Sequence, residues 1–488
     1  MKDFKITRRQ LLAATATSAV LVPAVAGCGK EESSDAGPKV APPEPPPNDG
    51  ATVLTLTPET IVEDLKTFEM GVQSGAMTMN SAILWTYTTD NTDKELIVWR
   101  DADTEDSILV AYRAQLTPVD GYIKTRVQGL GVGRYYFAFF NLNGKEFVTR
   151  STIGSFRTAF AEGDLRPLTI AGMTCSSMRN APFTSLRLTA SLNADIYCHL
   201  GDMTYNDGAK DKEDYRRYWR ETLTEKEYRQ ALSKTGMYST WDDHEITNNF
   251  DPERMALEQP ERLLAAKQAY FEHLPNDEGE KFRLWHSYRW GHTAEIFVLD
   301  SRSERLPSTR QSEKPIYISE EQMQWLKDGL KTSPCKYKVL LNSVPMTELL
   351  GVWEAADADR WQGYEVQRRE LLDFLTDNRI QGVLFLSGDF HFGYIAKVER
   401  LGPNEKQIEI AVGPTANGPN PLAVLAETGD LSSDDLFPPD QFIHFSGSWS
   451  AATLIELDPL NEKIRVRHID AREDNYNELL YDGEIDFG

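Results

Sequence analysis

The stretch QGVLFLSGDFH, residues 381–391, joins a short apolar run to an aspartate and a histidine. The continuous apolar run predicts a strand that is buried on both faces. Asp389 and His391 follow it with one residue between them. Alternate residues of an extended segment point to opposite sides, so both can serve one site only if the chain turns, as Gly388 allows. By itself, the stretch is a strand end with two polar residues.

Five other stretches after residue 166 share this pattern of an apolar run that ends in polar residues. They are PLTIAGMTCSS, ADIYCHLGDMTYND, MYSTWDDHEITNN, TAEIFVLDSR and KYKVLLNSVPM. Helical patterns such as ERLLAAKQAYFEHL and EVQRRELLDFLTDN separate them. Short apolar strands that alternate with helices predict an α/β layered sheet. Ligands bind at the carboxyl ends of strands in such folds, so we expect the polar clusters to converge on one crevice.

Residues 51–160 show a different sequence pattern. Short runs rich in aromatic and β-branched residues, such as SAILWTYT and ILVAYRAQL, are divided by turn segments such as DNTD and NLNG. This spacing is typical of a small β-sandwich. GRYYFAFF resembles a late strand of a fibronectin type III-like module. We therefore predict an N-terminal β-sandwich domain over residues 51–160 and a catalytic domain over residues 165–488.

The N-terminal residues have the features of an export signal. Arg8-Arg9 precede an uncharged stretch that is short for a membrane span, which indicates a twin-arginine signal over residues 1–28 rather than a buried helix. The end of the signal resembles a bacterial lipobox, which predicts lipidation of Cys28. The proline-rich segment 29–50 is a tether. We expect an exported protein of the periplasm or cell envelope that contacts the membrane only through an N-terminal lipid.

The amino-acid composition limits the classes of partner that the protein can bind. The chain of 488 residues has a formal net charge of −23, which repels a phosphate backbone and excludes generic nucleic-acid binding. A phosphorylated substrate would need metal ions or a few arginines. Only Cys175, Cys198 and Cys335 follow Cys28, so we predict no disulfide framework.

The polar clusters contain donors that suit a metal centre. GDMTY supplies Asp202 and Tyr205, and WDDHE supplies Asp243 and His244. Each cluster alone has an ordinary explanation, such as a turn or a helix cap. Together with the Asp-Phe-His stretch they provide oxygen and nitrogen donors for two or more metals. Adjacent metals can hold a phosphoryl group and generate hydroxide at neutral pH.

The ordered motifs GDMTY, WDDHEITNN, LDSR, NSVPM, RWQGYEVQRRELLDFL and LSGDFH resemble those of the PhoD-type alkaline phosphatases. These belong to the calcineurin-like metallophosphoesterases. The resemblance implies a layered metallophosphoesterase β-sandwich flanked by helices, after the small β-sandwich. It also implies Fe³⁺ together with Ca²⁺ in a two-metal or three-metal site.

The resemblance assigns roles to individual residues of this chain. It implies that Asp202 bridges two metals and that Tyr205, Cys175 and His391 bind iron. The second metal would be bound by Asp243, Asn342 and Asp389, while His244 would contact the phosphoryl group or protonate the leaving oxygen. Arg302 and Arg305 have two open interpretations, namely a bidentate phosphate clamp or ion pairs with the carboxylates.

We therefore predict a monomeric, exported metal-dependent phosphatase or phosphodiesterase that hydrolyses phosphate esters by in-line attack of a metal-bound hydroxide. Two alternatives stay open at this point. One is a phospholipase D-like diesterase that acts on lipid or an envelope polymer. The other is a catalytically inactive cell-surface binding protein, of which a calcium-binding adhesin is one form.

Overall fold

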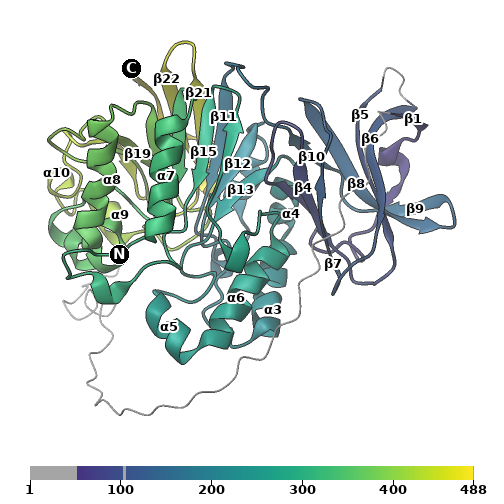
Figure 1. Cartoon of the computed structure of the whole chain (residues 1–488), viewed down its shortest axis with the longest axis horizontal. Helices are drawn as coiled ribbons and strands as arrows, with labels where there is room; N and C mark the ends of the chain where they lie inside the picture. Colours follow the sequence, from purple (N-terminus) through teal and green to yellow (C-terminus); the bar gives the residue numbers. More distant parts are fainter. Residues whose placement is uncertain (1–51, 103–105, 487–488) are drawn as a thin grey trace.

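The computed structural model describes residues 52–102 and 106–486 (Figure 1). The predicted signal, the tether and Cys28 lie outside the described residues. Within the described part of the chain, no helix is long and apolar enough to cross a membrane.

Two sheets form the centre of the molecule. The first contains nine strands in the order β23-β22-β21-β11-β12-β13-β3-β4-β7. From residue 168 onward it comprises β11 (Leu168–Met173), β12 (Ile196–Leu200), β13 (Met237–Thr240), β21 (Ala451–Asp458), β22 (Lys463–Asp470) and β23 (Leu479–Asp486). Strands β11, β12 and β13 run parallel, so their carboxyl ends lie at one edge of the sheet.

The second sheet has the order β14-β15-β16-β17-β19-β18-β20. Its strands are β14 (His286–Trp290), β15 (Ala294–Val298), β16 (Tyr337–Leu341), β17 (Val383–Ser387), β18 (Gly393–Lys397), β19 (Ile408–Ala411) and β20 (Phe442–Ser446). Strands β15, β16, β17 and β19 are parallel. The apolar run of residues 381–391 is thus an inner strand, β17.

Alternate side chains of these strands enter two different cores. Leu384 and Leu386 of β17 join the large core, which also contains Ile170 and Ile196 of the first sheet. Phe385, on the opposite face, packs with Leu326 and Leu371 of two helices. Continuous apolar strands arise because both faces are covered. The predicted layered sandwich with flanking helices is confirmed.

The helices cover the sheets as Figure 1 shows, with α7 and α8 in front of the second sheet and α3, α5 and α6 below the first. Their bounds are α2 (Thr184–Thr189), α3 (Lys212–Leu223), α4 (Lys226–Leu232), α5 (Pro252–Glu258), α6 (Pro260–His273), α7 (Glu320–Thr332), α8 (Glu365–Asp377), α9 (Pro421–Glu427) and α10 (Ser433–Leu436). Asp211 caps α3 and Ser319 caps α7, since each side chain accepts a backbone N–H of the first turn.

The small β domain contributes strands to both parts of the molecule. A separate sheet joins β1 (Thr52–Thr55), β2 (Val62–Glu63), β5 (Lys94–Asp101), β6 (Ser107–Leu116), β8 (Arg134–Asn143), β9 (Glu146–Arg150) and β10 (Gly154–Arg157). The strands β3 (Val72–Gly75), β4 (Ala82–Tyr87) and β7 (Tyr122–Val127) instead extend the nine-stranded sheet. The contact is made through Gly75, which pairs with Met237 of β13. The sheet therefore runs across the predicted boundary near residue 160.

Candidate metal centre

The predicted site residues follow the carboxyl ends of parallel strands. Cys175 follows β11, Asp202 follows β12 and Asp243 follows β13. From the second sheet, Asn342 follows β16 directly and Asp389 follows β17. The two sheets therefore present these side chains from both layers of the sandwich.

Three overlapping groups of side chains lie close enough to hold metal ions. In each group the ligand atoms all lie within 4.8 Å of one another. The groups are Cys175–Asp202–His391, Asp202–Asp243–His244 and Asp242–Asp243–Asp389. Asp202 joins the first group to the second and Asp243 joins the second to the third, so the three form one continuous centre.

Tyr205 lies against this centre. Its hydroxyl donates to Asp202 Oδ2 at 3.3 Å, and its ring lies 4.0 Å from the imidazole of His244, measured between centroids. Cys175 Sγ is 3.5 Å from the same Asp202 oxygen. A thiol, a phenol and an imidazole thus converge around one carboxylate.

The backbone is strained where the donors turn into the centre. Cys175, Asp202, Asp389 and His391 have φ values of 52°, 58°, 66° and 56°, in the left-handed region. A non-glycine residue with such a φ costs free energy and persists only where its surroundings enforce it. For Asp389 and His391 this is the turn that lets two residues, separated by one, serve the same centre.

Arg302 lies inside the carboxylate cluster. Its guanidinium is fully buried and forms a two-point ion pair with Asp242, in which Nη2 to Oδ2 is 3.1 Å. The same Nη2 donates to Asp389 Oδ1 at 3.1 Å, while Nη1 is buried without a hydrogen-bond partner. Arg305 instead pairs with Asp359 at 2.9 Å. Both arginines make ion pairs with carboxylates in this structure.

Asn342 has hydrogen-bond partners for both polar atoms of its side chain. Its side-chain oxygen accepts hydrogen bonds from Ser301 and from Trp361 Nε1, the latter at 3.3 Å, and its amide nitrogen donates to the Val344 carbonyl. The amide is fully buried and engaged by these neighbours. Its assignment as a metal ligand stays a prediction.

Three polar residues near the centre escaped the sequence analysis. Asp207 accepts a hydrogen bond from His244 Nδ1 at 2.8 Å. Asn417 donates to the Tyr205 hydroxyl and lies 2.9 Å from His391 Nε2. Glu245 accepts three backbone N–H groups through its carboxylate. Asp207 and Glu245 stand inside the quoted motifs, but nothing in a motif shows whether a carboxylate binds a metal or orients a ligand.

Burial and mutual charge shift the pKa values of the donors strongly. Burial raises the pKa of the Cys175 thiol well above its usual value, and Asp202 raises it further. Burial and the neighbouring Asp242 likewise hold the pKa of Asp389 well above normal, against the opposing effect of Arg302. Such groups ionise together only if added positive charge compensates them. The donor set therefore fits bound cations.

The pKa values of the two imidazoles, His244 and His391, shift in opposite directions. Burial disfavours the charged form of His244, but Asp202, the hydrogen bond to Asp207 and Asp243 outweigh burial and raise its pKa to about 10. His391, by contrast, has a pKa lowered to about 4 by burial and by the charge on His244. The two imidazoles are therefore suited to different tasks, one to carrying a proton and the other to donating a lone pair.

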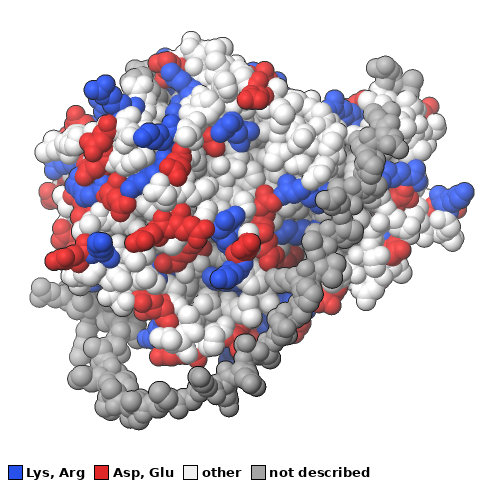
Figure 2. All heavy atoms as spheres, in the orientation of Figure 1, with Lys and Arg blue, Asp and Glu red and all other residues white. Residues whose placement is uncertain are grey.

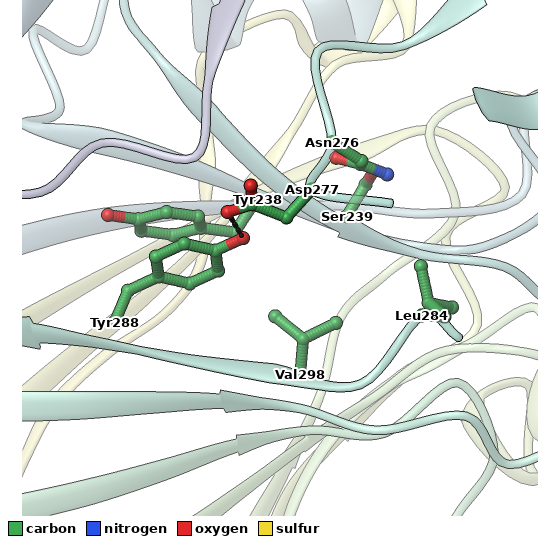
Figure 3. A pocket seen from close by; sticks show the side chains of 7 residues that line it. All are labelled: Tyr238, Ser239, Asn276, Asp277, Leu284, Tyr288 and Val298. Carbon is green, nitrogen blue, oxygen red and sulfur yellow. Dashed lines mark hydrogen bonds between the residues drawn. The ribbon is translucent and has the colours of Figure 1, made fainter. Parts of the chain in front are cut away.

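A small cavity elsewhere in the molecule contains none of these donors. Figure 3 shows it between β13 and the β14–β15 hairpin, where Tyr288 donates to Asp277 Oδ2 at 2.9 Å. On the face in Figure 2, acidic and basic side chains alternate without a continuous basic patch. The described cysteines Cys175, Cys198 and Cys335 are all free.

Residues 170–445 match the family model for the PhoD-like phosphatase, and residues 57–160 match the model for its N-terminal domain. The chain belongs to the PhoD-like phosphatase family. The predicted family membership is thus confirmed.

Individual relatives agree with this family. Alkaline phosphatase D of Bacillus subtilis (strain 168) is 24% identical over 389 residues, which cover 68% of this chain and 65% of that protein. The match thus spans just under two thirds of the relative's length. A solved structure of PhoD superposes with a TM-score of 0.71 at 20% identity, covering 86% of this chain and 89% of the other.

A second solved structure extends the likeness of the fold. The purple acid phosphatase PPD1 from yellow lupin seeds (Lupinus luteus) has a TM-score of 0.57 at 11% identity. The match covers 84% of this chain and 72% of the lupin chain. The phosphoesterase fold is therefore shared beyond the PhoD-like family.

Proposed function

We propose that this PhoD-like protein is a metal-dependent phosphatase or phosphodiesterase that hydrolyses phosphate esters. One observation carries the proposal, namely the three overlapping donor groups that share Asp202 and Asp243. A ligand centre of this extent, set at the carboxyl ends of strands, suits a substrate phosphoryl group that spans neighbouring cations. The family membership and the relative described as an alkaline phosphatase support the same conclusion.

We propose Fe³⁺ and Ca²⁺, the pair of metals that the resemblance to the PhoD-type phosphatases implies, and the donors present are compatible with this pair. Cys175, Tyr205 and His391 with Asp202 would hold Fe³⁺, since a thiolate and a phenolate suit a strongly acidic ion. Asp243 and Asp389, with Asn342 as predicted, would hold Ca²⁺, which prefers oxygen ligands. When bound, such ions would offset phosphoryl charge and make a nucleophile from water near neutral pH.

The chain's own groups then have defined tasks. Asp207 occupies His244 Nδ1, which leaves Nε2 to face the substrate. With its raised pKa, His244 would carry a proton and donate it to the leaving oxygen as water attacks phosphorus in line. Arg302 would hold Asp242 and Asp389 in place and offset their charge. The ion pairs favour this task over the phosphate clamp that was the other interpretation.

The remaining proposals concern the setting of the enzyme. We propose export by the twin-arginine route, with lipidation of Cys28 as the membrane anchor and a monomeric state. We also propose a division into an N-terminal domain over 51–160 and a catalytic domain over 165–488. Mass spectrometry of the N-terminal peptide from the native membrane fraction would test the lipid, and a diacylglycerol-modified Cys28 is the expected result.

The activity is tested with p-nitrophenyl phosphate and bis-p-nitrophenyl phosphate. The metal-replete protein should hydrolyse at least one ester, and a chelator should abolish turnover until calcium is restored. Faster cleavage of the bis-ester would favour the phospholipase D-like diesterase. If neither ester is cleaved by protein with a full metal complement, the chain is a binding protein and the proposal is wrong.

A further inference from the structure

Glu245 connects the two turns that carry Asp202 and Asp243. Its side chain is 1% exposed. One carboxylate oxygen accepts the backbone N–H of Met203 at 2.6 Å, and the other accepts those of Asp202 at 3.0 Å and Asp242 at 2.8 Å. A single buried carboxylate therefore satisfies three backbone donors from two separate strand ends.

The two turns also touch directly, and only a glycine allows this. Gly201 has a φ of 95°, and a Cβ placed on it would lie 2.4 Å from Asp242 Cβ and 2.5 Å from Asp242 N. No side chain fits in that space. The close approach of the two turns is therefore possible because Gly201 has no side chain, and it is stabilised by the hydrogen bonds that Glu245 accepts from both turns.

Further hydrogen bonds run between the same segments. Asn206 N donates to the His244 carbonyl at 2.9 Å, and Asn206 Nδ2 donates to the Glu245 carbonyl at 3.0 Å. His244 N lies 3.3 Å from Asp202 Oδ1. Asp202 has a strained φ of 58°, which its surroundings must enforce. Glu245 contributes to that constraint by accepting the N–H of Asp202, while Ser176 N donates to the Asp202 carbonyl at 2.9 Å.

We infer that Glu245 is a positioning residue of the metal centre, which holds Asp202 and the Asp243–His244 pair at the spacing that binds a cation. The inference rests on the proposed function, because it concerns the same centre. Glu245 itself lies in none of the donor groups found among the described residues. Its carboxylate would act through the backbone, as outer-shell partners of metal ligands commonly do.

The test compares Glu245→Gln with Glu409→Gln in the full-length protein. Glu409 is a matched control, since it is also buried and accepts two backbone N–H groups, from Met346 at 2.8 Å and Thr347 at 2.9 Å. The amide of glutamine presents a donor to backbone donors in both variants. We expect the dissociation constants for calcium and iron, from chelator competition, to rise about 10–100-fold in Glu245→Gln alone.

The outcomes separate this inference from the proposed function. Wild-type protein that binds no metal overturns the proposed function. Metal-binding wild type with equal affinities in Glu245→Gln, or an equal loss in Glu409→Gln, overturns the positioning role. Gly201→Ala should weaken metal binding in the same way, because it separates the same turns. Should these variants not fold, hydrogen exchange in metal-free wild type decides, since rapid exchange of the Asp202, Met203 and Asp242 amides would contradict the inference.

Discussion

The two ends of the metal centre differ in how the protein offsets their charge. At one end, which we term the thiol–phenol end, Cys175, Tyr205 and His391 surround Asp202, and no arginine of the described part of the chain is hydrogen-bonded to these side chains. At the carboxylate end, Asp242, Asp243 and Asp389 surround the buried guanidinium of Arg302. The first end depends on a metal to ionise its donors, whereas the second is partly neutralised by the chain itself.

Asp202 belongs to both of the donor groups nearest the thiol–phenol end, so its loss should have the largest effect. Asp202→Asn should lower metal content and reduce turnover by more than the about 100-fold typical of an outer-shell change. Metal analysis and assays with p-nitrophenyl phosphate measure this. Asp470→Asn is the control, because Asp470 is equally buried but pairs with Arg472 away from the centre. Full metal content in Asp202→Asn would show that it is not a shared ligand.

Arg302→Met tests the carboxylate end. Removal of one partner of a buried ion pair costs about 3–5 kcal/mol of unfolding free energy. We expect that loss in chelator and a clearly smaller loss in calcium, because a bound cation offsets the same carboxylates. Denaturant unfolding in both buffers measures the difference. Arg368→Met is the control, since Arg368 is buried with Glu399, and its loss should not depend on calcium. A calcium-independent loss in Arg302→Met would contradict the shared role.

Asp207→Asn should change the pH dependence of the reaction. The pKa of His244 is about 10, above its ordinary value of 6.5, partly because Asp207 accepts its Nδ1–H. Loss of the carboxylate lowers that pKa, so the basic limb of kcat/KM should move to lower pH by about one unit. The raised pKa also stabilises the fold fully below about pH 6.5, and this contribution is lost as pH rises toward 10. An unmoved basic limb would mean that His244 is not the acid.

Tyr205→Phe tests the thiol–phenol end through one absorption band. If the phenolate binds ferric iron, the variant should lose the visible charge-transfer band while the fold stays intact. Absorption spectra of the purified protein measure this. Tyr228→Phe is the control, because Tyr228 is also buried, but its hydroxyl hydrogen-bonds to Ser176 and to the Met203 carbonyl. If the visible band persists in Tyr205→Phe, Tyr205 is not an iron ligand.

Much of the fold could be predicted because its strands are short, apolar and covered on both faces. Residues 383–387 illustrate this, since they form β17 at the predicted place. The pairing of β3 with β13 could not be predicted, because Gly75 and Met237 lie far apart in sequence and turn spacing does not specify sheet partners. The N-terminal region read as a self-contained sandwich, whereas three of its strands extend the catalytic sheet.

Short motifs located most of the candidate donors, whereas Cys175 was proposed only through the family resemblance. All six candidates, Cys175, Asp202, Asp243, His244, Asp389 and His391, lie in the three groups, and their roles as metal ligands stay predictions. The tasks of Arg302, Asp207 and Glu245 were not predictable, because each depends on which distant group its side chain meets. The sequence shows that an arginine is present, but it does not show whether the guanidinium contacts a phosphate or a carboxylate.

The sequence by itself determined which donor types this protein possesses and that each follows a strand end. The tertiary structure decided which donors share one ion-sized space, which carboxylates a buried arginine offsets, and which carboxylate holds the turns together. The physical reason is the difference in how far along the chain the two kinds of interaction act. Strand and turn preferences act over a few residues, whereas Arg302 meets Asp389 across 87 residues of chain and Glu245 meets Asp202 across 43.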